Sequence, residues 1–105
     1  MLKFNDELIR LPFSDIRYVQ RVGRKLEIHT LKNGVIESNQ GIKELYEKLD
    51  SVRFIFIDRG CFVNIDYITR VTGGNIWLSA TEEKLPISRR LQTPVKEAIA
   101  KGWKL

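Results

Sequence analysis

The feature that most constrains the fold is a succession of short segments in which apolar and polar residues alternate. DIRYVQRV (Asp15–Val22) alternates in this way, and so does KLEIHTL (Lys25–Leu31). A period of two places alternate side chains on opposite faces of a β-strand. The side chains expected to share a face are Ile16, Tyr18, Gln20 and Val22 in the first strand and Leu26, Ile28 and Thr30 in the second. The pattern therefore predicts antiparallel β structure.

Turn-forming residues separate the strand segments. Asn33-Gly34 predicts a type I′ turn, because both central positions of that turn need positive φ, and Val35–Glu37 is expected to return as the partner strand. Gly73-Gly74 predicts another hairpin, between Tyr67–Val71 and Asn75–Ser79. The chain should thus be built largely from hairpins.

Two further segments are predicted as strands from other signals. Arg53–Asp58 is apolar almost throughout, which indicates a strand that is buried on both faces. Thr81–Lys84 is expected to form the turn that leads into Leu85–Ile87. Pro86 should end that last strand, because proline lacks a backbone donor.

Two segments carry a helical pattern instead. Gln40–Leu49 has an apolar stripe at helical spacing, with Asn39 as the expected N-cap and an ion pair expected between Glu44 and Lys48. The residues of the stripe are Ile42, Leu45, Tyr46 and Leu49. A second helix is predicted to begin at Thr93-Pro94 and to end at Gly102. Many short strands and two small helices predict a mainly β fold.

The composition is that of a single soluble globular domain. The chain has 105 residues, of which 43% are hydrophobic and 30% are charged, and we expect one domain over residues 1–105. No apolar run approaches the roughly 20 residues of a membrane span, and no signal-peptide pattern opens the chain. The one cysteine, Cys61, cannot form an internal disulfide, which favours a reducing, cytoplasmic setting.

The charge balance favours an anionic partner. Eighteen Lys and Arg residues against thirteen Asp and Glu residues give a formal charge of +5. The basic residues gather in three places: Arg17–Lys25, which contains no acid, then Arg59, then Arg89-Arg90. This uneven distribution is typical of a binding face.

The sequence gives little support to catalysis, to a metal site or to a cofactor. The only histidine, His29, lies within a predicted strand, and His29 and Cys61 together are too few to form a zinc site. Gly73-Gly74 lacks the Lys-Ser/Thr that follows the glycines of a phosphate-binding loop. We therefore predict a non-enzymatic protein that needs no cofactor.

Two stretches resemble the LytTR DNA-binding domain family. They are FIFIDRGCFVNIDYITRV (Phe54–Val71) and IWLSATEEKLPISRRL (Ile76–Leu91). Their shared elements are an aromatic-led strand, a central arginine, aliphatic-Val-Asn, Tyr-Ile and, some twenty residues later, aliphatic-Pro-aliphatic-Ser-Arg-Arg. The chain departs from the family pattern at Asp58 and Gly60, where the family often has histidine and serine.

The resemblance implies an elongated arrangement of short antiparallel sheets. It also implies a sequence-specific transcriptional regulator in which basic loops, and not a recognition helix, enter the major grooves of double-stranded DNA. Such domains commonly act as output domains of bacterial two-component response regulators, follow a receiver domain in a longer parent protein, and bind repeated sites as homodimers. Carried over by position, the DNA-binding residues are Arg24, Lys25, Arg59, Gly60, Ser88 and Arg90.

An alternative without DNA is a small β module for protein–protein interaction or dimerisation. In that case Asp58 and the acidic helix around Glu44–Glu47 would mark the partner face, and an exposed Trp103 would suit it. Asn64 is expected to shape a turn and not to contact a ligand.

Overall fold

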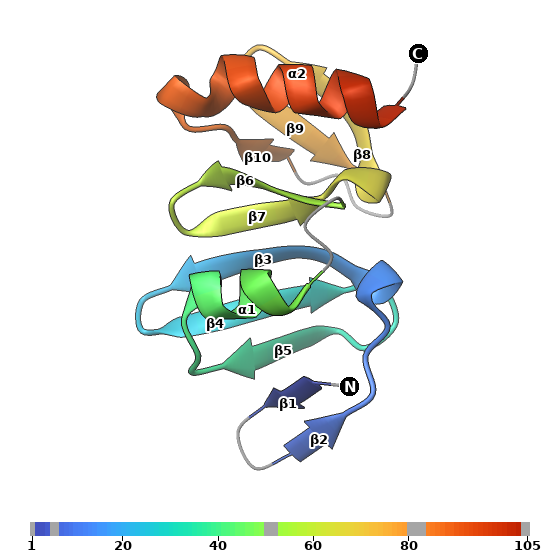
Figure 1. Ribbon diagram of the computed structural model, residues 1–105, viewed down its shortest axis with the longest axis vertical. Coiled ribbons are helices and arrows are strands. Elements are labelled where there is room, and N and C mark those ends of the chain that lie inside the picture. Colours follow the sequence, from blue (N-terminus) through green and yellow to red (C-terminus); the bar gives the residue numbers. More distant parts are fainter. Residues whose placement is uncertain (1, 5–6, 50–52, 80–83, 104–105) are drawn as a thin grey trace.

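The protein is a stack of layers along one long axis. The computed structural model describes residues 2–4, 7–49, 53–79 and 84–103, and the molecule measures 40 × 25 × 25 Å. A two-stranded hairpin lies at one end, a five-stranded sheet with helix α1 in the middle, and a three-stranded sheet with helix α2 at the other end (Figure 1). The predicted mainly β, elongated fold of antiparallel sheets is confirmed.

The elements follow one another as short strands with two helices and three 3₁₀ turns. The strands are β1 (Leu2–Phe4), β2 (Glu7–Ile9), β3 (Ile16–Val22), β4 (Lys25–Thr30), β5 (Val35–Ser38), β6 (Phe54–Asp58), β7 (Cys61–Asn64), β8 (Ile68–Thr72), β9 (Asn75–Leu78) and β10 (Lys84–Pro86). The helices are α1 (Ile42–Lys48) and α2 (Gln92–Trp103), and the 3₁₀ turns are η1 (Phe13–Asp15), η2 (Ile65–Tyr67) and η3 (Arg89–Leu91).

The central sheet joins the two halves of the chain. Its strand order is β5-β4-β3-β7-β6, so the pairing of β3 with β7 connects the meander β3–β5 to the hairpin β6–β7. The smaller sheet has the order β10-β9-β8, and every strand pair is antiparallel. Because each hairpin turn reverses the chain, successive turns of the central sheet fall on two opposite edges of the molecule.

Two apolar cores lie on either side of the hairpin β6–β7. The first core, under α1, consists of Leu11, Ile16, Val19, Leu26, Ile28, Ile42, Leu45, Leu49, Phe54 and Phe62. The second core, under α2, consists of Tyr18, Ile57, Cys61, Val63, Ile68, Ile76, Leu78, Leu85, Ile87, Val95 and Ile99. The predicted stripe of α1 is confirmed, because Ile42, Leu45 and Leu49 are buried in the first core and Tyr46 packs against it.

Strand β6 is packed on both faces, as its apolar sequence predicted. Phe54 belongs to the first core and Phe56 packs against it, whereas Ile57 belongs to the second core and Ile55 packs against that one. Phe56 and Phe62 meet edge-to-face with ring centroids 5.3 Å apart. A strand between two cores has no solvated face, which explains the absence of alternation.

The predicted alternation of β3 is wrong at its start. Ile16 pairs with Thr30 and Tyr18 pairs with His29, so two steps along β3 correspond to one step along β4. Arg17 is therefore the extra residue of a β-bulge, which reverses the faces that follow. As a result Ile16 faces the first core and Tyr18 the second, although the sequence pattern placed them together.

The hairpin β4–β5 is confirmed, but its predicted two-residue turn is wrong. His29 pairs with Val35, and the Thr30 N–H donates to the Gly34 carbonyl at 3.0 Å, so the loop is longer than Asn33-Gly34 alone. Asp15 holds this loop by accepting from the Lys32 N–H at 2.9 Å and from Asn33 Nδ2 at 2.7 Å. A distant carboxylate thus adds to the local contacts of Thr30, whose hydroxyl accepts from the Asn33 N–H at 2.9 Å and donates to the Gly34 carbonyl at 2.6 Å.

Both helices begin away from the expected caps. The N-cap of α1 is Gly41 and not Asn39, and no side chain caps it. Helix α2 begins at Gln92, directly after η3, and continues through Gly102 to Trp103. The ion pair between Glu44 and Lys48 is present at 3.7 Å. The turn predicted at Thr81–Lys84 lies mostly outside the described residues, and β10 does end at Pro86.

Candidate nucleic-acid interface

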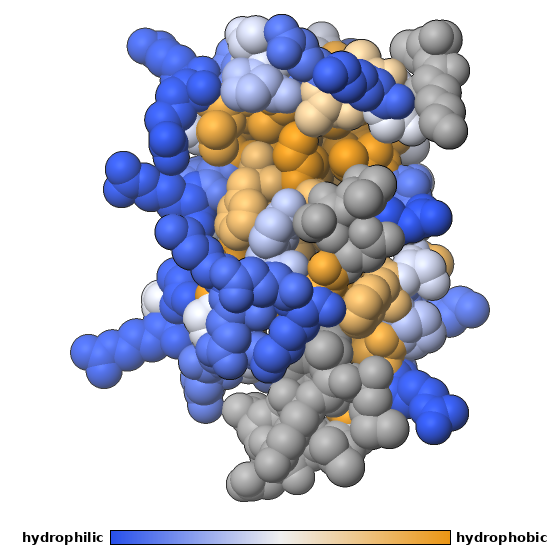
Figure 2. All heavy atoms as spheres, viewed as in Figure 1, coloured by the Kyte–Doolittle hydropathy of each residue, from blue (hydrophilic) through white to orange (hydrophobic). Residues whose placement is uncertain are grey.

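Three chain segments with basic residues lie along one edge of the molecule. They are the turn between β3 and β4, the turn between β6 and β7, and the connection from β10 into α2; all three lie on the left in Figure 1. Hydrophilic side chains follow this edge over most of its length (Figure 2). We call the six predicted residues on these segments the basic edge: Arg24, Lys25, Arg59, Gly60, Ser88 and Arg90.

Main-chain hydrogen bonds hold the three segments together. The Arg21 N–H donates to the Gly60 carbonyl at 2.7 Å, which fixes the end of β3 to the second turn. The Ser88 N–H donates to the Ile57 carbonyl at 2.8 Å, which fixes the third segment to β6 just before the same turn. Segments far apart in sequence are thus set side by side by backbone contacts and do not depend on flexible side chains.

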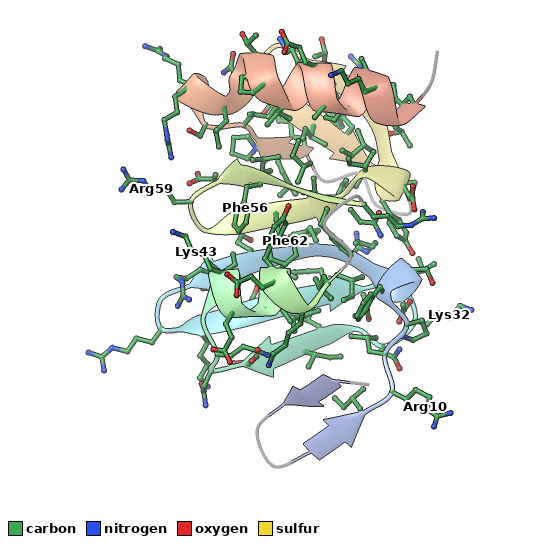
Figure 3. All side chains as sticks on the ribbon, viewed as in Figure 1. Arg10, Lys32, Lys43, Phe56, Arg59 and Phe62 are labelled. Carbon is green, nitrogen blue, oxygen red and sulfur yellow. The ribbon has the colours of Figure 1, made fainter. Side chains whose placement is uncertain are left out.

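The second and third segments form one open groove. Its volume is about 560 Å³, and its lining residues are Lys43, Phe56, Asp58, Arg59, Arg90 and Leu91. Arg59 and Lys43 both extend toward this edge, whereas Arg10 and Lys32 lie on the opposite side of the molecule (Figure 3). A groove lined by both cations and apolar side chains suits the phosphates, sugars and base edges of a nucleic acid.

The predicted cations differ in what surrounds them. Lys25 forms an ion pair with Glu37 at 3.3 Å, with more than half of each side chain exposed. Arg24, Arg59 and Arg90 are exposed, and none of them makes an ion pair with any residue that the structure describes. Unpaired guanidiniums keep all of their donors available for a ligand.

Gly60 and Ser88 carry no charge and affect the shape of the basic edge. A Cβ added at Gly60 would lie 3.3 Å from Cβ of Arg21, so glycine allows the second turn to lie close to β3. Ser88 is half-buried, and its side chain does not cap the 3₁₀ turn that it precedes. The Ser88 hydroxyl is therefore not used to cap η3.

Among the residues that the structure describes, Asp58 is the one acid that lines the groove. It is the exposed last residue of β6 and pairs in register with Cys61. Burial, together with the negative charge of Asp58, raises the pKa of the Cys61 thiol to about 12, so this buried cysteine packs as a neutral apolar side chain. Asp58 makes no ion pair within the described part of the chain.

Comparison with known proteins identifies the family. Residues 6–100 match the LytTr DNA-binding domain family. The chain belongs to the LytTR family. It is a DNA-binding domain of a non-enzymatic family, which confirms the resemblance and the class inferred from its sequence.

Two curated relatives and one solved structure are similar to this LytTR domain. The sensory transduction protein LytT of Oceanobacillus iheyensis is 29% identical over 98 residues, which cover 85% of this chain and 39% of the relative. An uncharacterized response regulatory protein of Vibrio cholerae is 29% identical over 93 residues, which cover 83% of this chain and 36% of the relative. The chain thus spans less than half the length of either relative.

The solved structure supports the fold. It is the LytTr DNA-binding domain of a protein described as a methyl-accepting/DNA response regulator from Bacillus cereus. The TM-score is 0.75 at 22% sequence identity, and the match covers 93% of each chain. The layered arrangement of Figure 1 is therefore that of a LytTR fold.

The sequence did not single out three residues that the LytTR domain brings to the groove. Lys43 comes from the first turn of α1, and Phe56 and Leu91 come from β6 and η3. Lys43 stands among the charged residues of an amphipathic helix, where no local signal separates a binding lysine from a solvated one. The segment of Phe56 was predicted as a buried strand and as the aromatic-led strand of the family resemblance, without a contact to a ligand.

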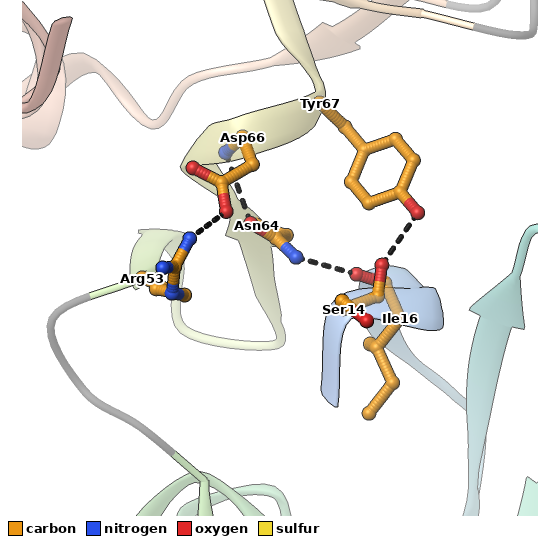
Figure 4. Close-up of polar contacts among 6 residues, drawn as sticks. All are labelled: Ser14, Ile16, Arg53, Asn64, Asp66 and Tyr67. Carbon is orange, nitrogen blue, oxygen red and sulfur yellow. Dashed lines mark hydrogen bonds and ion pairs between the residues drawn. The ribbon is translucent and has the colours of Figure 1, made fainter. Parts of the chain in front are cut away.

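Asn64 has the structural role that its sequence position predicted. It is fully buried, its Oδ1 accepts from the Asp66 N–H at 2.9 Å, and its Nδ2 donates to the Ile16 carbonyl at 2.9 Å (Figure 4). Arg53 pairs with Asp66 at the same corner. Tyr67 donates from its hydroxyl to the Ser14 carbonyl at 2.5 Å, and burial, followed by the charge of Asp15, raises its pKa. These contacts shape the edge opposite the groove.

The remaining candidate residues of the LytTR domain are structural. His29 stacks on Tyr18 with ring centroids 4.1 Å apart, as expected of a histidine that packs within a strand. Trp103 is half-buried and packs against the second core, so the expectation of an exposed tryptophan at a partner face is wrong. No group of metal-ligating side chains and no helix long and apolar enough to cross a bilayer occurs in residues 2–4, 7–49, 53–79 and 84–103.

Proposed function

We propose that the chain is the sequence-specific DNA-binding output domain of a transcriptional regulator, in which the three segments of the basic edge enter the major grooves of double-stranded DNA. The convergence of these segments on one edge carries the proposal. They are far apart in sequence, and each brings to this edge an arginine that makes no ion pair with the described residues: Arg24, Arg59 and Arg90. Like charges gathered on one surface are destabilising unless an anionic partner neutralises them.

The dimensions of the molecule are compatible with this mode of binding. Its long axis of 40 Å compares with about 34 Å for one helical turn of B-DNA. Turns distributed along one side can therefore reach grooves on one face of the duplex. The proposed contacts do not use a recognition helix, because none of the six residues of the basic edge lies on α1 or α2.

The roles of the six residues follow from their surroundings. Arg59 and Arg90 line the groove without an ion pair, so they are assigned to base edges, where arginine pairs with guanine O6 and N7. Arg24 lies on the exposed turn before β4, Lys25 is the exposed first residue of β4, and both are assigned to phosphates. Ser88 and Gly60 bring hydroxyl and backbone groups close to the duplex, and Arg89 is assigned to the DNA backbone or to a carboxylate of the domain.

Residues 1–105 are proposed to act as one domain, attached in a longer parent protein to a receiver domain. The length of the two curated relatives supports this arrangement. A homodimer on two repeated half-sites is the expected form on DNA. Selection of bound sites from a random duplex pool tests it, because a dimer enriches two similar half-sites about one helical turn apart.

A titration against salt tests the proposed function directly. Fluorescence anisotropy with the selected duplex is expected to give an affinity that falls steeply with salt, with a slope that corresponds to roughly 4–6 neutralised phosphates. An unselected duplex of equal length serves as the control and should bind more weakly at every salt concentration. Equal, salt-independent binding of the two duplexes would contradict the proposal and favour a protein-binding module.

A further inference from the structure

Asp58 places a negative charge in a groove that is otherwise lined by cations and apolar side chains. Asp58 is exposed at the tip of the β6–β7 hairpin, next to Arg59, on the surface that is proposed to meet DNA. A carboxylate near phosphates weakens binding by charge repulsion. Such a residue is favourable at a DNA surface where it accepts a hydrogen bond from a base.

The contacts of Asp58 leave it free to accept. Three cations, Lys43, Arg59 and Arg90, line the same groove, yet none of them forms an ion pair with Asp58. No hydrogen-bond donor from the described residues is directed to its carboxylate either. Both oxygens are therefore available to a ligand that enters the groove.

We propose that the Asp58 carboxylate accepts a hydrogen bond from the exocyclic amino group of a cytosine in the major groove, next to a guanine held by Arg59. This inference rests on the proposed function and names a base-pair preference of the same site. Arg59 follows Asp58 directly in the chain and lines the same groove. Within a C·G pair the cytosine amino donor lies beside the guanine O6 and N7 acceptors, so an adjacent acid and arginine match one such pair or two neighbouring pairs.

Cytosine is favoured over the other bases by the pattern of donors and acceptors. In the major groove cytosine presents only its N4 amino donor, whereas guanine presents O6 and N7 and thymine presents O4, all of which repel a carboxylate. Adenine presents an N6 donor, but its N7 acceptor lies next to that donor. A carboxylate can therefore approach cytosine without facing an acceptor on the same base.

Substitution by asparagine gives a directional test. Asparagine pairs bidentately with adenine N6 and N7, so Asp58→Asn should change the selected base at one position from cytosine to adenine. The experiment selects bound duplexes from a random pool in parallel with wild type, Asp58→Asn and Glu97→Gln. Glu97 is exposed on α2 and does not line the groove, so its substitution makes the same charge change and should leave the selected sequence unchanged.

A base analogue tests the hydrogen bond itself. Replacing the selected cytosine with 2-pyrimidinone, which lacks the amino group, should weaken wild-type binding about tenfold. The same replacement should leave binding by Asp58→Ala nearly unchanged, because that variant has no acceptor to lose. Thermal unfolding curves of the Asp58 variants should match wild type, since the side chain is exposed, and would identify a loss that comes from misfolding.

The outcomes separate this inference from the proposed function. If wild type selects a defined site and Asp58→Asn selects the same bases, the role of Asp58 is overturned and DNA binding stands. If 2-pyrimidinone weakens DNA binding by wild type and by Asp58→Ala to a similar extent, the role of Asp58 is also overturned. If wild type selects no sequence and binds all duplexes alike at every salt concentration, the proposed function fails first.

Discussion

At the scale of single residues, two exposed cations on the same edge have different surroundings. Lys25 lies on the outer surface of β4 and is partly neutralised by Glu37 at 3.3 Å. Arg90 lines the groove with Arg59 and makes no ion pair with the described residues. A fork of unpaired donors in a groove suits base recognition, whereas a mobile ammonium group on a strand surface suits phosphate.

The contrast predicts distinct losses on substitution. Arg90→Ala should weaken binding to the selected duplex by about 1–3 kcal/mol and relax the preference at one base pair. Lys25→Ala should weaken all duplexes alike and lower the salt slope by about one. Anisotropy titrations against matched and mismatched duplexes measure both effects.

Arg70→Ala is the control for this pair. Arg70 is exposed on β8, where its guanidinium lies 5.3 Å from the ring centroid of Trp77, and it does not line the groove. Its loss removes the same charge and should change affinity less than either substitution on the basic edge. A loss of base preference in Lys25→Ala, with preference kept in Arg90→Ala, would show that the two assigned roles are reversed.

At the scale of elements, the sequence predicted what depends on local pattern. The hairpin at Gly73-Gly74 and the stripe of α1 follow from residues that are neighbours along the chain, and the strand predicted at Leu85–Ile87 is present one residue earlier, as β10 (Lys84–Pro86). The bulge at Arg17 did not follow, because it depends on how β3 pairs with both β4 and β7. The loop before β5 was missed for a similar reason, since its shape depends on Asp15, eighteen residues before Asn33.

The candidate site shows the same limit. The arginines of the three segments were visible in the sequence as clusters of charge and in its family resemblance. The groove that joins Arg59 to Arg90 was not visible, because the backbone bond from Ser88 to Ile57 creates it. Lys43 lines the groove from α1, and the position of that helix over the sheet cannot be predicted from its local sequence.

One buried side chain connects three elements and gives a test at this scale. Asn64, at the end of β7, bonds the backbone of η2 through Asp66 and that of β3 through Ile16. Asn64→Ala removes the buried hydrogen bonds to the Ile16 carbonyl and from the Asp66 N–H, and a hydrogen bond contributes about 0.5–1.5 kcal/mol to stability. Urea denaturation should therefore show a free energy of unfolding lower by at least that amount.

Asp66→Ala provides the comparison at the same corner. It removes the exposed ion pair with Arg53 but keeps the backbone N–H that Asn64 binds. Exposed pairs contribute about 0–1 kcal/mol, so this loss should be the smaller of the two. Equal losses would mean that the corner is held by charge and not by the buried amide.

At the scale of the whole molecule, the two cores share their central elements. Strand β3 gives Val19 to the first core and Tyr18 to the second. The hairpin β6–β7 likewise gives Phe62 to the first core and Val63 to the second. Neither core can lose its packing without disturbing strands that the other core needs, and the same strands carry the turns of the basic edge.

This sharing predicts one cooperative unfolding transition for the whole chain. Trp77 lies on β9 and Trp103 on α2, so tryptophan fluorescence reports on the side of the second core. Ile28→Ala opens a cavity in the first core, with an expected loss of about 2–5 kcal/mol. If the cores unfold together, the urea midpoint should fall equally by fluorescence and by far-UV circular dichroism.

Two further variants serve as controls. Ile76→Ala in the second core should lower both midpoints equally, whereas Val35→Ala, at a side chain that is 53% exposed, should change them little. A fluorescence midpoint that Ile28→Ala leaves unmoved would mean that the two halves fold independently, and the basic edge could then lose its first turn while keeping the other two.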